Sequence, residues 1–166
     1  MSSSTYMALL ASAYKAALTR KLGSVGKDKF DCYIDGGTLL PSFKDMGDGM
    51  IVARFNYKAI FEFEALPASL MDPRILMATT TCWLLENDKD RKQQNLKGPV
   101  IEVDAYATDN QGSLSDMTIE IEFSEPITMQ KVAEGEGDIQ YNGAQWNIAP
   151  FAVDVAESGE VLSRER

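Results

Sequence analysis

The feature that most constrains this chain is a run of strict alternation between Met50 and Ala65. Apolar residues share one side of the run, and polar or charged residues fill most positions between them. The apolar set is Ile51, Ala53, Phe55, Tyr57, Ala59, Phe61, Phe63 and Ala65. A period of two predicts a long, half-buried strand. At about 3.3 Å per residue the strand spans ~50 Å, so we expect part of it to project as an arm or to augment a neighbour's sheet.

Two other segments repeat at helical spacing. The first is an apolar stripe closed by Arg20, Lys21 and Gly23, and it consists of Tyr6, Leu9, Leu10, Ala13, Tyr14, Ala17 and Leu18. It predicts an amphipathic helix that packs on its own sheet or partly on a neighbouring subunit. The second helix starts at Asp72-Pro73 and runs to about Glu86. Its apolar face is Leu76, Thr80, Trp83 and Leu84. Residues 87–95 contain no apolar side chain and predict an exposed loop.

Shorter alternating runs predict the remaining strands. One begins at Phe30 and ends at the Gly36-Gly37 break, followed by a loop over residues 38–49. Two more cover residues 101–107 and 117–123, and Pro126 then permits a bend or an edge before residues 127–132. Asn142-Gly143 supplies the positive φ angles of a tight hairpin turn.

The order of elements indicates the fold class. A helix, two strands, a second helix and three to five further strands, joined by short turns, predict an α+β fold. We expect a mainly antiparallel sheet with two helices packed on one face, and a long strand or arm. Residues 1–150 are predicted to form a single domain, and residues 151–166 a flexible, charged C-terminal tail.

Composition removes most enzymatic chemistry. The chain has no histidine, which excludes Ser-His-Asp and Cys-His catalysis and the usual zinc sites. Its net charge of −9 argues against binding nucleic acid through the neutralisation of phosphate groups by Lys and Arg. We therefore expect no enzyme activity, no cofactor and no direct sequence-specific binding of nucleic acid.

Carboxylate pairs are the remaining candidates for chemistry. Glu62 with Glu64, Glu102 with Asp104, and Glu120 with Glu122 are spaced so that each pair points to one side of a strand. Such a pair can chelate a divalent cation, or it can simply form the solvent face of an amphipathic strand. The second interpretation is favoured, and no metal site is predicted.

The cysteines and the hydropathy pattern bear on the compartment. Cys32 and Cys82 each lie in an apolar element and are predicted to be reduced core thiols. No window approaches the ~20 apolar residues of a membrane span, and the start of the chain lacks a basic secretory signal. We expect synthesis and assembly in the cytoplasm and no membrane partner.

Four stretches resemble the tail-completion proteins of contractile-tailed temperate phages, often called protein R, and their relatives in phage-tail-like bacteriocins. They are Cys32-Tyr-Ile-Asp35-Gly-Gly37, the strand Phe55 to Phe63, the helix Ile75 to Asn87 closing in Trp-Leu-x-Glu-Asn, and Ile119-Glu-Ile-Glu-Phe123-Ser-Glu125. The resemblance covers roughly residues 5–150. It implies a structural tail terminator, a homohexameric ring that caps the tail tube and sheath. It also implies the tail tube protein, the sheath protein and a head–tail connector as partners, in a virion tail or a headless tailocin.

The ring predicted from the resemblance needs surfaces that contact neighbours. The candidate interface residues are Phe43, Lys44, Arg54, Tyr57, Lys58, Glu62, Trp146 and Phe151. The acidic surplus is a candidate lining for a lumen that repels passing DNA. Alternative functions are another phage part, such as a tube or head–tail joining protein, a small-molecule or metal-binding domain, and an acidic mimic of nucleic acid.

Overall fold

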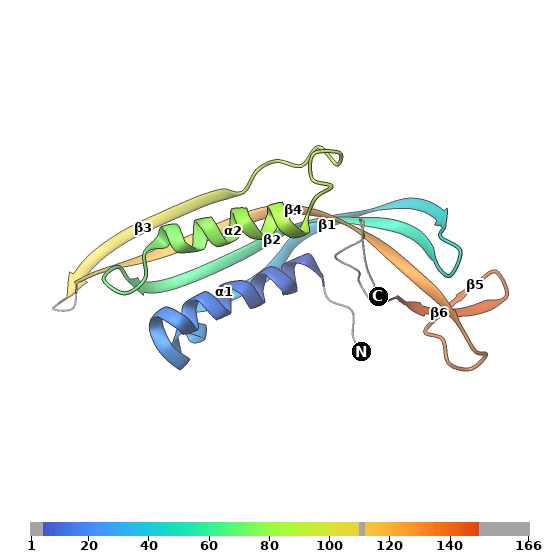
Figure 1. The fold of residues 1–166 in the computed structure, drawn as a ribbon, viewed down its shortest axis with the longest axis horizontal. Helices are drawn as coiled ribbons and strands as arrows, with labels where there is room; N and C mark the ends of the chain where they lie inside the picture. Colours follow the sequence, from blue (N-terminus) through green and yellow to red (C-terminus); the bar gives the residue numbers. More distant parts are fainter. Residues whose placement is uncertain (1–4, 110–111, 150–166) are drawn as a thin grey trace. The chain divides into compact units, whose positions relative to one another are not determined.

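The computed structural model describes residues 5–109 and 112–149 (Figure 1). Its elements are α1 (Tyr6–Leu22), a 3-10 helix η1 (Gly23–Lys29), β1 (Phe30–Asp45), β2 (Met50–Pro67), α2 (Pro73–Asn87), β3 (Val100–Asp109), β4 (Gly112–Val132), β5 (Ile139–Tyr141) and β6 (Ala144–Ile148). The sheet order is β1-β2-β4-β6-β5, and β3 also pairs with β4. The α+β class with two α-helices and an antiparallel sheet is confirmed.

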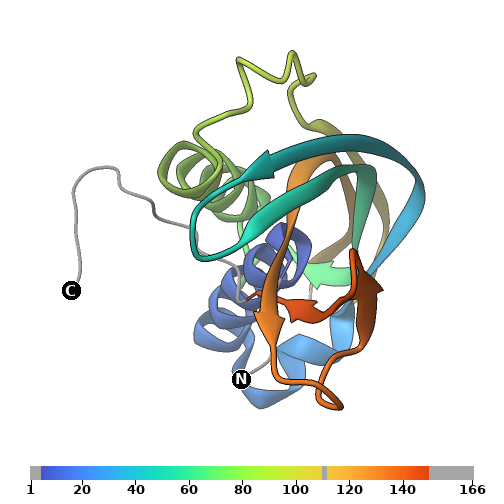
Figure 2. The same cartoon turned by 90° about the vertical axis from the view of Figure 1, so that its right-hand side faces the viewer.

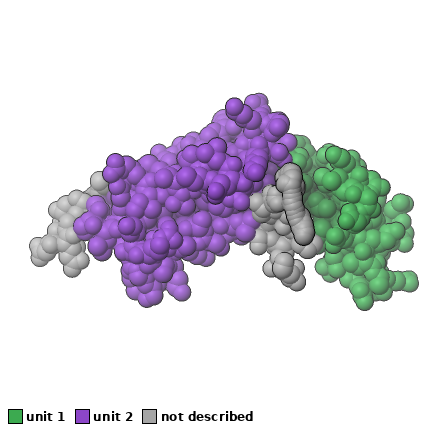
Figure 3. All heavy atoms as spheres, viewed as in Figure 1, with its two compact units in different colours: residues 1–5, 39–55, 125–166 green, residues 6–38, 56–124 purple. Residues whose placement is uncertain are grey.

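The chain folds as two compact units, each built from segments that are distant in sequence (Figure 3). The described part of unit 1 comprises residues 39–55, 125–149 and Thr5; unit 2 comprises residues 6–38, 56–109 and 112–124. β1, β2 and β4 contribute residues to both units, so no linker separates them. The single domain expected over residues 1–150 stays a prediction.

The core of unit 2 joins both α-helices to the buried side of β2 and β4. The Tyr14 ring of α1 lies 5.1 Å from Phe61 and 5.2 Å from Phe63, and its hydroxyl bonds Thr80 of α2. Tyr6 contacts Trp83 of α2 and Phe123 of β4. Both views of the ribbon show α1 and α2 side by side (Figures 1 and 2). Burying these rings supplies the main driving force for unit 2.

The alternation in β2 is confirmed through Phe63 and stops at Ala65. Ala53, Tyr57, Ala59, Phe61 and Phe63 are all buried. Ala65 has φ of +53° and donates its N–H to Asp116 Oδ1 at 2.9 Å. This left-handed residue shifts the phase, so Leu66 becomes the next buried side chain.

The loop predicted over residues 38–49 is wrong for most of its length. β1 continues to Asp45, and only residues 46–49 connect it to β2. Gly36, at φ of +80°, lets the strand continue where a break was predicted. Pro41 is tolerated because β1 ends the sheet order and needs no partner for a missing N–H on its outer side.

β2 itself is not an arm that could augment another sheet. It lies between β1 and β4, so both of its backbone edges face strands of its own chain. Pro126, where the sequence permits a bend or an edge, lies within β4, which runs through it to Val132. Pro126 falls between the end of the β3 pairing at Glu120 and the start of the β6 pairing at Met129.

The loop after α2 is less exposed than its composition predicts. Asp88 is only 4% exposed and pairs with Arg91 Nη1 at 2.9 Å. Arg91 also donates to the carbonyl oxygens of Glu122 at 2.7 Å and Lys97 at 2.6 Å. The guanidinium therefore ties the loop to β4.

Candidate assembly surfaces

The outer edge of β1 is the longest strand edge that ends the sheet order, and its side chains are exposed from Tyr33 to Asp45. Within unit 1 it carries three large apolar side chains, Leu39, Leu40 and Phe43, which are 61%, 49% and 63% exposed. An edge strand presents unpaired N–H and C=O groups, and apolar side chains along it favour pairing with another chain. Pro41 and Lys44 are residues that limit uncontrolled pairing of this kind.

An aromatic cluster in unit 1 continues from this edge. Phe43 stacks on Tyr141 at 6.1 Å between ring centroids, and Tyr141 lies 6.3 Å from Trp146. Trp146 Nε1 donates to the Tyr141 carbonyl, and Lys131 lies over the indole ring at 5.7 Å. The predicted Asn142-Gly143 turn is confirmed, with φ of +53° and +75°, and it holds the β5–β6 hairpin that presents Tyr141 and Trp146.

A depression of about 510 Å³ adjoins the aromatic cluster. It combines carboxylates and aromatic rings, being lined by Asp45, Gly47, Asp48, Gly49, Met50, Lys131, Tyr141, Asn142 and Trp146. Gly49 is required beside it, because a Cβ there would lie 2.8 Å from the Met129 carbonyl oxygen. Aromatic and charged groups around a hollow suit the side chains of a protein partner.

Unit 2 presents a second surface, the side of its strands opposite the helices. Lys58 pairs with Glu120 at 3.6 Å, and the Tyr33 hydroxyl donates to Glu62 at 3.1 Å. These contacts join β1, β2 and β4, and the β3–β4 register sets Glu102 opposite Thr118. We call this surface the open sheet face; its charged residues include Asp31, Asp35, Lys58, Glu62, Glu64, Glu102, Asp104, Asp116, Glu120 and Glu122.

The negative potential of the open sheet face acts on Tyr33. Its hydrogen bond to Glu62, and then the nearby carboxylates of Glu62, Asp35 and Glu120, raise the pKa of Tyr33. All three predicted carboxylate pairs lie on this face. Their position agrees with the interpretation that they form the solvent face of amphipathic strands. Within residues 5–109 and 112–149, no group of three or more Asp, Glu, Cys or His side chains is placed to hold a metal ion.

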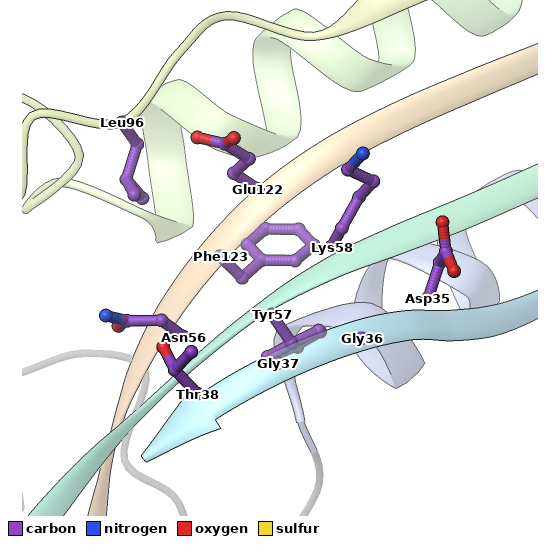
Figure 4. A pocket seen from close by; sticks show the side chains of 10 residues that line it. All are labelled: Asp35, Gly36, Gly37, Thr38, Asn56, Tyr57, Lys58, Leu96, Glu122 and Phe123. Carbon is purple, nitrogen blue, oxygen red and sulfur yellow. The ribbon is translucent and has the colours of Figure 1, made fainter. Parts of the chain in front are cut away.

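A shallow hollow of about 400 Å³ lies at one side of the open sheet face (Figure 4). The Asn56 and Lys58 side chains of β2 and Glu122 of β4 line it, together with Gly36 and Gly37 of β1. Asn56 Oδ1 is buried in the described structure without a hydrogen-bond partner. The hollow contains no nucleophile beside a base, so it offers contact surface rather than chemistry.

The predicted interface residues are divided between the units. Phe43, Lys44, Arg54 and Trp146 belong to unit 1, whereas Tyr57, Lys58 and Glu62 belong to unit 2. Tyr57 is 4% exposed and accepts the Met7 N–H, so its ring is part of the core. Phe151 lies outside the described residues. The assignment of these residues to an interface stays a prediction.

The eight predicted interface residues do not include Leu39, Leu40 or Tyr141, whose exposure is visible only in the structure. The two leucines fall within residues 38–49, a segment that the sequence makes a candidate for contact between subunits, where they form an apolar pair beside proline. The prediction of two core thiols is wrong. Neither described cysteine forms a disulfide, but Cys32 is only half-buried, where burial raises the pKa of its thiol, and Cys82 is exposed on α2.

Comparison with known proteins now decides the family. A family model described as P2 phage tail completion protein R (GpR) matches residues 10–150. This chain belongs to that family. The GpR-family chain is also 30% identical over 150 residues to an uncharacterized 19.2 kDa protein in the rep-hol intergenic region of Haemophilus phage HP1 (strain HP1c1), covering 90% of this chain and 87% of the relative.

Membership confirms the resemblance drawn from the four sequence stretches. A tail completion protein is a structural part of a phage tail and associates with other tail components. No described helix of this GpR-family chain is long and apolar enough to cross a bilayer.

Proposed function

We propose that this chain is a tail terminator that forms a closed ring, of six copies, on the last layer of the tail tube and sheath. A growing tube is an open heterologous assembly, and a closed ring with a different outer face stops its growth. The proposal includes the tube protein, the sheath protein and a head connector as partners, assembly in the host cytoplasm, and no enzymatic activity.

The observation that carries the proposal is the exposed edge of β1 with its apolar side chains. Leu39, Leu40 and Phe43 expose apolar surface along an edge that can accept a strand from another chain. The aromatic cluster of Phe43, Tyr141 and Trp146 extends this surface in unit 1. A sheet edge with exposed apolar side chains favours assembly with other chains. Membership of the family supports a phage tail as the assembly that the chain joins.

The decisive experiment deletes the chain from the phage or tailocin and measures the mass and length of the particles. Tails of unregulated length support termination, because the block to further polymerisation has been removed. Tails of normal length, fully assembled with their sheath, would end the proposal.

Electron microscopy of the purified chain separates this function from that of a tube protein. Rings or monomers that bind tail ends support a terminator, whereas long filaments of the chain alone would assign it to the tube. The double variant Leu39→Lys/Phe43→Lys tests the β1 surface and should reduce ring formation. Its matched control is Leu70→Lys, which changes an equally exposed apolar residue outside β1.

A further inference from the structure

The segment from the middle of α1 to the end of η1 is positively charged. We call it the basic end; its members are Lys15, Arg20 and Lys21 of α1 and Lys27 and Lys29 of η1, of which all but Lys15 lie in a last turn. Asp28 is the acidic residue within Tyr6–Lys29. Within the described residues, none of these five cations forms an ion pair with another side chain. Their charge is therefore available to a partner.

Close packing fixes the basic end to the body of unit 2. A Cβ at Gly26 would lie 2.7 Å from the Leu18 carbonyl oxygen, so only glycine allows η1 to approach α1 this closely. Leu18 is itself fully buried. The cations consequently project from a rigid base and not from a loose loop, which lowers the entropic cost of docking.

The open sheet face carries the opposite charge. Its carboxylates include Asp31, Asp35, Glu62, Glu64, Glu102, Asp104, Asp116, Glu120 and Glu122, and among its described residues Lys58 is the cation. Lys58 is already paired with Glu120. Glu64, Glu102 and Asp104 are exposed and form no ion pair with a described residue.

The two charged surfaces lie on opposite sides of one compact unit. Tyr14 places α1 against Phe61 and Phe63, which point to one side of β2, whereas Glu62 and Glu64 point to the other. Figure 2 shows α1 and α2 together on one side of the strands. A single copy therefore cannot satisfy both surfaces with its own charges, but a second copy can.

We propose that the basic end of one copy docks on the open sheet face of the next copy. This contact is heterologous, so it propagates from copy to copy and closes a ring when the rotation allows; the proposal thus rests on the ring proposed above. Two open sheet faces repel each other, as do two basic ends, so the charges also disfavour a symmetric dimer. Val25 and Tyr33, exposed by 59% and 45%, supply apolar contact within the two surfaces.

Two charge-altered chains test the contact by complementation. Lys21→Glu/Lys27→Glu cancels the net positive charge of the basic end, and Glu64→Lys/Glu102→Lys lowers the net negative charge of the open sheet face. Each variant alone should self-associate at least about tenfold more weakly than wild type, because one side of the charge attraction is lost or weakened. An equimolar mixture should form pairs, because the unchanged basic end of the second variant can dock on the unchanged open sheet face of the first; analytical ultracentrifugation and mass photometry measure this.

The control is Lys89→Glu/Lys92→Glu, which reverses two exposed lysines outside both surfaces and should leave association unchanged. Far-UV circular dichroism and melting curves establish that every variant is folded. A mixture no more associated than its components, or wild type that remains monomeric throughout, would overturn the proposal. Variants that self-associate like wild type but no longer bind tails would also overturn the proposal. In that case the two surfaces would bind another tail protein and not a second copy of this chain. The proposed role in tail termination is tested separately, by the length of the tails that form when the chain is deleted.

Discussion

At the scale of single residues, the core of unit 2 is held by a relay of hydrogen bonds between helices. The Thr80 hydroxyl donates to the Leu76 carbonyl at 2.7 Å, so its lone pairs remain to accept from Tyr14. Tyr14 and Thr80 are both buried, and neither hydroxyl reaches water. A threonine in the middle of an apolar helix face is explained by this role and not by helix propensity.

The two ends of this relay should respond unequally to deletion. Thr80→Val removes the acceptor and leaves a buried phenol donor unsatisfied, so we expect a loss of about 1–3 kcal/mol in the free energy of unfolding. Tyr14→Phe removes the donor and leaves Thr80 bonded to Leu76, so we expect about 1 kcal/mol. Urea unfolding of both variants measures the difference; a larger loss for Tyr14→Phe would contradict the direction of the relay.

The same phenol gives the protein a specific alkaline response. Burial raises the pKa of Tyr14 above its ordinary value of 10.0. The unfolded chain therefore loses this proton near pH 10 while the folded chain retains it, and the stabilisation present below pH 10 is lost as pH rises further. We expect a slope of about −1.4 kcal/mol per pH unit from this group. Urea titrations between about pH 9 and 11 should show a shallower decline for Tyr14→Phe.

Arg91 is the residue whose loss should matter most outside the aromatic core. Arg91→Met removes the cation beside the buried Asp88 carboxylate and two bonds to backbone carbonyls. We expect a loss of about 3 kcal/mol. Lys92→Met is the matched control, because Lys92 is exposed on the same loop, and should change stability by less than about 0.5 kcal/mol. Equal effects in a chemical denaturation experiment would show that Arg91 is a surface residue in solution.

At the scale of elements, the β5–β6 hairpin depends on a glycine that precedes it. A Cβ at Gly137 would lie 2.7 Å from the Trp146 backbone nitrogen and 2.5 Å from the Gln145 Cβ. Gly137 also donates its N–H to Gln145 Oε1 at 2.8 Å. This close approach lets the residues before β5 pack against β6, and it places Trp146 within the aromatic cluster.

Gly137→Ala should therefore disturb the hairpin. We expect a loss of about 1–3 kcal/mol, because backbone atoms must move to admit the methyl group. Gly98→Ala is the control, since nothing lies within 4 Å of its added Cβ and its φ is not positive. Trp146 fluorescence should report the change in the first variant, and the contribution of Trp83, which lies in unit 2, is common to both variants. Identical melting curves for both variants would contradict the packing.

At the scale of the whole molecule, the two proposed contacts differ in chemistry. Leu39, Leu40 and Phe43 of β1 are apolar and belong to unit 1, whereas the basic end and the open sheet face are charged and belong to unit 2. The first kind of contact is insensitive to salt, and the second is screened over a Debye length of about 8 Å at physiological ionic strength. A ring built from both contacts has two adjustable sources of affinity.

Salt should therefore weaken assembly without unfolding the chain. Raising NaCl from about 50 mM to 500 mM is expected to increase the dissociation constant of self-association, while the melting temperature changes little. The Glu64→Lys/Glu102→Lys variant should show a weaker dependence on salt than wild type. Sedimentation at both salt concentrations measures this, and association that strengthens with salt would assign the contact to apolar surface alone.

The sequence by itself determined the family, both α-helices, the buried side of β2 and the Asn142-Gly143 turn. These features depend on hydrophobic periodicity and on turn-forming residues, and both are determined by residues that are close together in the sequence. Only the tertiary structure decided that β1 continues through Gly36 and Pro41, that Asp88 is buried, and that Cys82 is exposed. The physical reason is that these outcomes depend on neighbours far along the chain. A proline is tolerated within a strand only where no partner strand needs its N–H, and the Asp88 carboxylate is buried where the Arg91 guanidinium reaches it.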